Sequence, residues 1–278
     1  MVNSIWKVIF GITIPDSVTS IGGNPFINCP SLSKIVVSTQ HPVFTTIDGV
    51  LYSKPEKALI CFPIGKALDS FEIPTGINSV ADSAFSYNTS IKTITLPATV
   101  TTICYDAFSN CKSLTSIMIP DSIVTIGEHA FAACESLKSI IIPESVNLID
   151  AWTFYGCKSL TSITIPDGVT TIGKKAFADC ESLAIITIPE SVTLIDDEAF
   201  YGCKSLTSIT IPDGVTTIEE KAFAQCESLA SIVIPNTVTS IDYNVFSSCP
   251  SLKCVIVVKD SYAEQYCMDN GLPYMILP

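Results

Sequence analysis

The chain has 278 residues, a formal net charge of −12, and a composition that is 47% hydrophobic and 15% charged. This much apolar material is enough for a continuous core, so the composition argues against disorder. The acidic balance and the absence of a basic run oppose binding to nucleic acid and to anionic membrane surfaces. No window of about 18 apolar residues is present, so we also expect no membrane insertion.

A period of 23 residues runs through most of the chain and aligns a proline column and a phenylalanine column. A fixed period of this size is typical of a solenoid, in which each coil buries its apolar side against its neighbours. We therefore expect residues 1–278 to form a single α/β repeat solenoid. The columns hold Pro74, Pro97, Pro120, Pro143, Pro166, Pro189, Pro212 and Pro235, and Phe85, Phe108, Phe131, Phe154, Phe177, Phe200, Phe223 and Phe246.

In chain order, residues 1–8 are expected to be an N-terminal remnant of a preceding turn or an N-terminal cap, and 9–31 form the first repeat. The second repeat, 32–67, is longer because of an insertion near 44–63. Alternating apolar residues around the turn-forming Ser53-Lys54-Pro55-Glu56 predict a β-hairpin that grows out of the solenoid. The hairpin either shields apolar surface at an edge or contacts a ligand as a protrusion.

Eight further repeats follow without gaps from 68 to 251, so that 9–251 holds ten repeats. Their skeleton is L-x-x-I-x-I-P-x-x-V-x-x-I-x-x-x-A-F-x-x-C-x-x. The I-x-I step predicts a short parallel strand that ends at the proline. The V-x-x-I step predicts a second extended or turn segment, and A-F-x-x-C is long enough only for a short helical or 3₁₀ turn.

The last segment, 252–278, departs from the repeat and is expected to cap the open C-terminal coil. Ser261 is a candidate N-cap for a short helix through Met268, with Gly271 as its stop signal.

Eight of the twelve cysteines share one column, which predicts a line of buried thiols behaving as small hydrophobes. A single column supplies one thiol per coil, whereas structural zinc needs about four converging ligands, so we expect no metal. Neighbouring Cα atoms about 4.8 Å apart lie at the short end of the disulfide range, which keeps oxidation as an alternative. The column is Cys29, Cys111, Cys134, Cys157, Cys180, Cys203, Cys226 and Cys249.

Two charged columns accompany these thiols. The residue after the cysteine alternates in sign, which predicts a ladder of ion pairs that favours one register; it runs Lys112, Glu135, Lys158, Glu181, Lys204, Glu227. The residue after the proline keeps one sign, and such like charges require solvent, backbone N–H partners in the turn, or a cation; a turn-capping role is the commonest of these. This column holds Asp121, Glu144, Asp167, Glu190 and Asp213.

Strand positions that point away from the core form a hydroxyl-rich, nearly uncharged face. It is either a contact surface for an extended partner or simply a consequence of β propensity. The candidate contact residues are Ser116, Met118, Ser139, Ile141, Ser162, Thr164, Ile185, Thr187, Ser208 and Thr210. A separate group, Trp152, Tyr155 and Tyr201, replaces small or charged residues, and either anchors a partner or fills gaps between coils.

Signals for catalysis are weak. The two histidines, His41 and His129, have no credible Ser or Cys nucleophile near them in the sequence, and no glycine-rich phosphate loop or H-E-x-x-H motif occurs. We therefore predict no enzyme, no catalytic residue and no cofactor.

The repeat skeleton resembles that of the BspA-like leucine-rich repeats, and Ile47 to Ser53, IDGVLYS, is similar to the hairpin insertion of that family. The resemblance implies a right-handed leucine-rich-repeat superhelix. It also implies a cell-surface or secreted location and a protein ligand on a host or neighbouring cell. The asparagine ladder of better-known leucine-rich repeats has no equivalent here, so ligand sites of those relatives do not transfer.

Two hypotheses for function follow. The first is a non-enzymatic protein-binding or adhesion module, and the second is a structural spacer with no ligand of its own. The stretch CKSLTSITIPDGVTTI occurs at both 157–172 and 203–218, and such uniformity favours the spacer.

Overall fold

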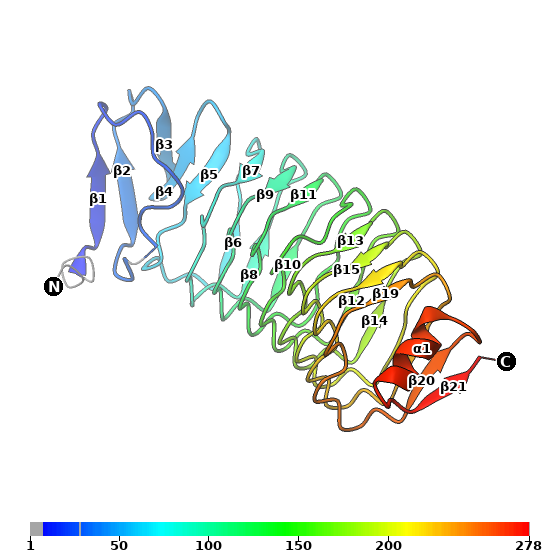
Figure 1. Ribbon diagram of the computed structural model, residues 1–278. Helices are drawn as coiled ribbons and strands as arrows, with labels where there is room; N and C mark the ends of the chain where they lie inside the picture. Colours follow the sequence, from blue (N-terminus) through cyan, green and yellow to red (C-terminus); the bar gives the residue numbers. More distant parts are fainter. Residues whose placement is uncertain (1–7, 28, 278) are drawn as a thin grey trace. The chain divides into compact units, whose positions relative to one another are not determined.

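The computed structural model describes residues 8–27 and 29–277 (Figure 1). These residues form two compact units, Met1–Leu137 and Lys138–Pro278, and each is described by itself. Apart from Val8, the remnant expected at residues 1–8 lies outside the described residues. That 1–278 forms one solenoid stays a prediction.

In the first unit, parallel strands stack one coil above another. β1 (Gly11–Ile14) pairs with β2 (Lys34–Val37), and a second row contains β6 (Ser70–Glu72), β8 (Thr93–Thr95) and β10 (Ser116–Met118). The V-x-x-I segments form the shorter parallel strands β7 (Ser79–Val80), β9 (Thr102–Ile103) and β11 (Thr125–Ile126), visible as a separate row in Figure 1. Both predicted extended segments are therefore confirmed in this unit.

The insertion forms three antiparallel strands, β3 (Phe44–Ile47), β4 (Val50–Ser53) and β5 (Ala58–Cys61). The β4–β5 hairpin around Ser53–Glu56 is as predicted, but it does not grow out of the solenoid. All eight residues of β4 and β5 are buried, and β5 continues the parallel row through β7.

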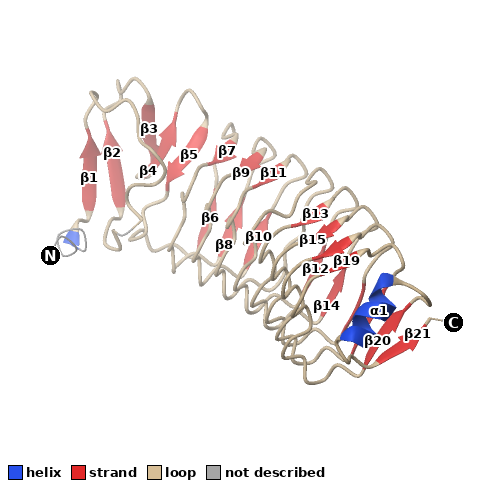
Figure 2. Ribbon diagram, in the orientation of Figure 1, coloured by secondary structure: helices blue, strands red, loops and turns tan. Residues whose placement is uncertain are grey.

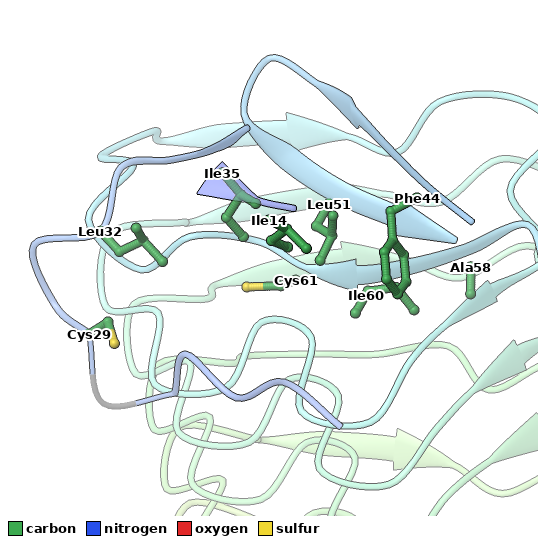
Figure 3. Packing of buried hydrophobic residues seen from close by; sticks show 9 residues of the cluster. All are labelled: Ile14, Cys29, Leu32, Ile35, Phe44, Leu51, Ala58, Ile60 and Cys61. Carbon is green, nitrogen blue, oxygen red and sulfur yellow. The ribbon is translucent and has the colours of Figure 1, made fainter. Parts of the chain in front are cut away.

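Side chains from the insertion complete the core at this end of the unit. Figure 3 shows Phe44 and Leu51 beside Ile14, Ile35 and Ile60. The hairpin strands therefore shield apolar surface, whereas the turn at 54–57 is exposed, so ligand contact at that turn stays a prediction.

The second unit repeats the pattern. Its first coil contributes an isolated bridge between Ile141 and Thr164, and β12 (Ser162–Thr164) pairs with β14 (Ile185–Thr187). β16 (Ser208–Thr210), β18 (Ser231–Ile234), β20 (Cys254–Val257) and β21 (Tyr274–Ile276) form another parallel sheet. The V-x-x-I row is β13 (Thr171–Ile172), β15 (Leu194–Ile195), β17 (Thr217–Ile218) and β19 (Ser240–Ile241).

The A-F-x-x-C segments are tight turns with i to i+3 hydrogen bonds, such as Cys111 N to Phe108 O at 3.1 Å. These i to i+3 bonds agree with the predicted short helical or 3₁₀ turn, and left-handed residues, with φ of 54° at Asp106 and 59° at Asn110, keep it from continuing as a helix. Alternate amides instead donate to the next coil, as in Phe108 N to Ala130 O at 2.8 Å. Each turn therefore adds a third hydrogen-bonded line between coils.

The phenylalanine column forms the centre of each unit. Within the first unit, Phe85 stacks on Phe108 with ring centroids 5.1 Å apart, and in the second unit the Phe154–Phe177 and Phe177–Phe200 centroids are 5.5 and 5.4 Å apart. All five side chains are fully buried. Stacked rings of successive coils thus fix the repeat, as the sequence period predicts.

The C-terminal segment contains α1 (Tyr262–Asp269), which contacts β19, β20 and β21 (Figure 2). Ser261 is its N-cap, with its Oγ accepting from Glu264 N at 3.2 Å, and Gly271 follows with a φ of 63°. The predicted helix and its signals are confirmed. β21 also pairs with β20, so the segment covers the backbone edge of the preceding coil.

Candidate interaction surface

The exposed side of the I-x-I strands is named here the strand face. Alternation along each strand buries the central isoleucine and exposes its two neighbours, as in β12, where Ile163 is buried between exposed Ser162 and Thr164. All ten predicted contact positions are exposed. They are Ser116 and Met118 in the first unit, and Ser139, Ile141, Ser162, Thr164, Ile185, Thr187, Ser208 and Thr210 in the second.

Three aliphatic side chains stand out on this hydroxyl-rich surface. The exposed fractions of Ile141, Ile185 and Met118 are 81%, 69% and 68%. Single exposed aliphatics are ordinary on protein surfaces, so exposure alone does not define a binding site. The prediction that the strand face contacts a partner stays a prediction.

The strand face of the second unit is interrupted between β14 and β16. Across the described residues no backbone pairing joins these two strands, although their coils are adjacent and in contact. The V-x-x-I row is continuous through the same coils, since β15 pairs with β17. The coils therefore separate only along the strand face.

A hollow of about 380 Å³ lies at this interruption. Both strand edges line it, with Ile185 and Thr187 on one side, Ser208 and Thr210 on the other, and Glu190 nearby. Sequence reasoning missed Glu190 as part of this surface. The available signal was Ile185, which occupies a position that is serine in the neighbouring coils of the unit.

Backbone groups show the same interruption. The amides of Ala184 and Ala230 donate to the preceding coil, to Thr161 O at 3.2 Å and Thr207 O at 2.8 Å. Within the described chain, the equivalent bond from Thr207 N to Ala184 O is absent. At the other end of the strands Ile211 N donates to Val233 O at 2.9 Å. Among the described residues no equivalent bond joins Ile188 N to Thr210 O, or Ile165 N to Thr187 O of the paired strands β12 and β14, so only the Thr207 amide distinguishes the interruption.

The carboxylates after the prolines flank the strand face of the second unit. These four exposed residues, Glu144, Asp167, Glu190 and Asp213, are named here the acidic row. As far as the structure describes the chain, none of the four accepts a hydrogen bond from its turn or pairs with a cation. Backbone bonds such as Val146 N to Pro143 O, at 3.0 Å, close the turns instead. The predicted turn-capping role is therefore wrong for this row.

The cysteine column is buried apart from half-buried Cys249, and all the cysteines are free thiols. Burial raises the pKa of Cys111 to about 12 and holds the pKa of Cys203 well above its ordinary value. Six of these Sγ atoms donate to the carbonyl oxygen of a phenylalanine in the preceding coil at 3.1–3.2 Å, a bond that the sequence did not indicate. The donors and acceptors are Cys111 and Phe85, Cys134 and Phe108, Cys180 and Phe154, Cys203 and Phe177, Cys226 and Phe200, and Cys249 and Phe223.

The alternating charged column forms ion pairs within each unit. Lys112 Nζ lies 3.0 Å from Glu135 Oε1, and Lys204 Nζ lies 3.4 Å from Glu181 Oε1. These side chains are partly exposed, so each pair contributes little free energy and mainly favours one register.

The aromatic group at Trp152 is half-buried. The rings of Trp152 and Tyr155 are perpendicular at 4.9 Å, and Lys175 Nζ lies 4.4 Å from the centroid of the Trp152 ring. Burial and the nearby Asp179 carboxylate raise the pKa of Tyr155. These neighbours in adjacent coils favour the gap-filling interpretation over a contact anchor.

His41 is a buried residue whose two ring nitrogens both contact the backbone. Its side chain is fully buried, its Nδ1 accepts from the Phe44 amide at 3.0 Å, and its Nε2 lies 3.2 Å from the Pro15 carbonyl oxygen. The only other histidine, His129, stacks edge-on against Tyr105 with centroids 5.4 Å apart. Neither environment resembles a nucleophile and base pair.

A second hollow, of about 340 Å³, lies in the first unit beside the insertion. Ile21, Ala58, Ile60, Asp82 and Cys104 are among its lining residues. In the part of the chain that the structure describes, no group of three His, Cys, Asp or Glu side chains could hold a metal ion, and no helix has the length and apolarity to cross a membrane.

Stacked parallel strands, buried phenyl and thiol columns and an exposed strand face define a leucine-rich-repeat solenoid. A family model for the BspA type leucine rich repeat region, in six copies, matches residues 7–54, 60–184 and 147–270. The chain therefore belongs to the BspA-type leucine-rich repeat family.

Solved structures of bacterial leucine-rich repeat proteins are similar. A protein from Eubacterium ventriosum is 28% identical with a TM-score of 0.67, and the match covers 86% of this chain and 58% of that one. A leucine rich cell surface protein from Faecalibacterium prausnitzii is 31% identical with a TM-score of 0.55, covering 93% and 81%. One from Bacteroides ovatus is 25% identical with a TM-score of 0.56, covering 97% and 84%. No curated protein matches the chain.

Proposed function

We propose that the chain is a non-enzymatic protein-binding or adhesion module of a cell-surface or secreted protein, and that its ligand is a protein on a host or neighbouring cell. The observation that carries this proposal is the strand face, where Ile141 and Ile185 are largely exposed on rigid, hydrogen-bonded coils. A rigid surface loses little conformational entropy on binding. The similar Faecalibacterium protein is described as a cell surface protein, which supports the location.

A structural spacer is the second candidate. The repeated stretch at 157–172 and 203–218 favours it, since a spacer needs uniform coils and no distinctive surface. The exposed isoleucines and the interruption between β14 and β16 favour the binding module, because both depart from that uniformity.

A capture experiment separates the candidates. The full chain, immobilised, is exposed to extracellular-matrix and cell-surface proteins of a host, alongside an Ile141→Asp variant. Leu148→Asp is the matched control, because Leu148 is 40% exposed in the same coil but lies outside the strand face. We expect Ile141→Asp to reduce capture by about tenfold or more and Leu148→Asp to leave it unchanged.

Saturable enrichment that Ile141→Asp removes would support the binding module. No enrichment by the unmodified chain would contradict it and leave the spacer. Equal loss in both variants would contradict the strand face as the contact surface. The location is tested separately by labelling intact source cells with an antibody against the chain. Signal only after permeabilisation would contradict a surface or secreted location.

A further inference from the structure

The second unit ends in a strand with one unpaired side. β21 pairs with β20 alone and is the last strand of its sheet, and Figure 2 shows it beyond β20. The Pro273 carbonyl oxygen accepts from β20 at 2.8 Å and the Leu277 amide donates to β20 at 2.7 Å. Because backbone groups alternate in direction along a strand, the N–H and C=O groups of Tyr274 and Ile276 point to the other side. No described residue pairs with them there, and such an edge is a template for another strand.

The core side of the sheet is also open at β21. Val255 in β20 is fully buried, whereas Tyr274, its partner in the register, has an exposed fraction of 39%. Ile276 is only half-buried, although its partner Val257 is fully buried. β21 thus extends the apolar row of the coils, and no further strand among the described residues covers it. A strand added beside β21 would remove this apolar surface from water.

The charges around β21 allow a second copy of the chain to approach. Exposed strand edges usually resist pairing through charged side chains or proline, but the stretch 270–277, NGLPYMIL, is uncharged. Its one proline, Pro273, directs its backbone toward β20, so it does not block the open side. The segment 252–278 carries two lysines and three side-chain carboxylates, a net charge of −1 out of −12 for the chain. Repulsion between two copies at this end is therefore small.

We propose that β21 pairs with β21 of a second copy of the chain, antiparallel about a two-fold axis at Met275. Such a pair uses the same surface on both copies, so the segment is its own complement. Tyr274 lies opposite Ile276 of the second copy, and the two residues exchange the open N–H and C=O groups. An aromatic ring thereby meets a β-branched side chain twice, which is a favourable cross-strand combination. The pairing does not depend on what the strand face binds.

The exposed area sets the strength of this pairing. Tyr274, Met275 and Leu277 are 39%, 59% and 47% exposed. At about 200 Å² for a large side chain, they offer about 300 Å² per copy, against about 800 Å² per partner in a standard interface. Two copies should therefore associate reversibly and at high concentration, rather than as a permanent dimer.

Sedimentation equilibrium of the full chain at increasing concentration measures the association, with reductant present because the cysteines are free thiols. Met275→Lys places two like charges opposite each other at the two-fold axis. Met268→Lys is its matched control, since Met268 is 50% exposed in α1 of the same segment but lies outside the edge strand. We expect the same concentration-dependent rise in mass for the unmodified chain and Met268→Lys, and association weakened by about tenfold or more in Met275→Lys.

Two further variants test the backbone pairing and its register. Ile276→Pro removes an N–H that points to the open side and takes no part in the β20 ladder, so it should abolish the dimer while thermal melts show a folded chain. Met275→Cys should form an intermolecular disulfide on oxidation, because Cα atoms of opposing residues at that position lie about 4.5 Å apart. Met268→Cys is the control and should form far less.

A constant monomer mass at every concentration would overturn the proposal. A dimer that Met275→Lys leaves intact, that both lysine variants weaken equally, or that a folded Ile276→Pro variant retains would overturn it as well, because association would then use another surface. Cross-linking of Met268→Cys as readily as Met275→Cys would contradict the two-fold register.

Discussion

The same sixteen residues, CKSLTSITIPDGVTTI, occur at 157–172 and 203–218 in the second unit, yet their strands behave differently. In the first copy β12 pairs with β14 of the next coil and is joined to the preceding coil by the isolated bridge between Thr164 and Ile141. In the second copy β16 pairs with β18 of the next coil but has no ladder to β14 of the preceding one. Identical repeats therefore create an irregular surface where a neighbouring coil differs, and Ile185 marks that coil.

Substitution in the phenylalanine core, which both copies share, should lower the unfolding free energy more than any other change considered. Phe177 lies in the coil 160–182 of the first copy, fully buried and stacked on Phe154 and Phe200. Phe177→Ala removes these contacts and leaves a cavity, so we expect a loss of about 3–5 kcal/mol in unfolding free energy. Denaturant titration followed by circular dichroism measures it, and a loss below about 1 kcal/mol would contradict a stacked core.

Gly168 and Gly214 occupy the same position in the two copies, so their substitutions to alanine can be compared directly. We expect Gly214→Ala to destabilise the protein by about 1–3 kcal/mol, because the new Cβ overlaps the Glu190 carbonyl oxygen. Gly168→Ala meets only ordinary contact and should change stability by no more than about 1 kcal/mol, in the stabilising direction. Thermal melts of both variants provide the measurement. Equal effects would mean that the two turns are equivalent after all.

The unfolding free energy should fall at high pH, because the buried thiols resist ionisation in the folded state. The pKa of Cys203 is raised by burial, and that of Cys111 is raised to about 12 from 9.0. Below pH 9 the thiols are protonated in both the folded and the unfolded state, so their contribution to the unfolding free energy is fully present. Between pH 9 and 12 only the unfolded state ionises, so stability falls as pH rises. Denaturation at increasing pH under reducing conditions checks this, with Cys203→Ala expected to show a shallower fall.

The ion pairs of the alternating charged column should contribute least to the unfolding free energy. Lys204→Ala breaks the 3.4 Å pair with Glu181, which is partly exposed on both sides. We expect a loss of about 0.2–1 kcal/mol that shrinks further in high salt. A salt-independent loss above this range would indicate that Lys204 stabilises the coil by packing.

The fold was largely predictable because each column repeats in successive coils. The phenylalanine and cysteine columns, both extended segments and the cap at Ser261 follow from patterns that agree many times over. The burial of β4 and β5 was not predictable, because alternation and turn residues determine which strands pair but not what covers them. The A-F-x-x-C turns were predictable as short turns, but their left-handed positions were not, because they hold residues as different as Asp106, Ala133 and Lys175.

The candidate surface was predictable only in part. Exposure of the strand face follows from the two-residue period of a strand, and all ten positions are exposed. The interruption beside β16 could not be derived from its own sequence, since in the identical stretch at 157–172 Thr164 bridges Ile141 of the preceding coil, whereas β16 has no pairing with β14. Glu190 lines the hollow because the interruption lies beside it, and its position in the acidic row alone did not predict this.

Amide hydrogen exchange, resolved to single residues, tests the central claim most directly. The Thr207 amide has no partner in the preceding coil, whereas the amides of Ala184 and Ala230, one coil away on either side, donate at 3.2 and 2.8 Å. Thr207 should therefore exchange at least about tenfold faster than both, because its opening costs no hydrogen bond. Equal protection of the three amides would contradict an open ladder between β14 and β16.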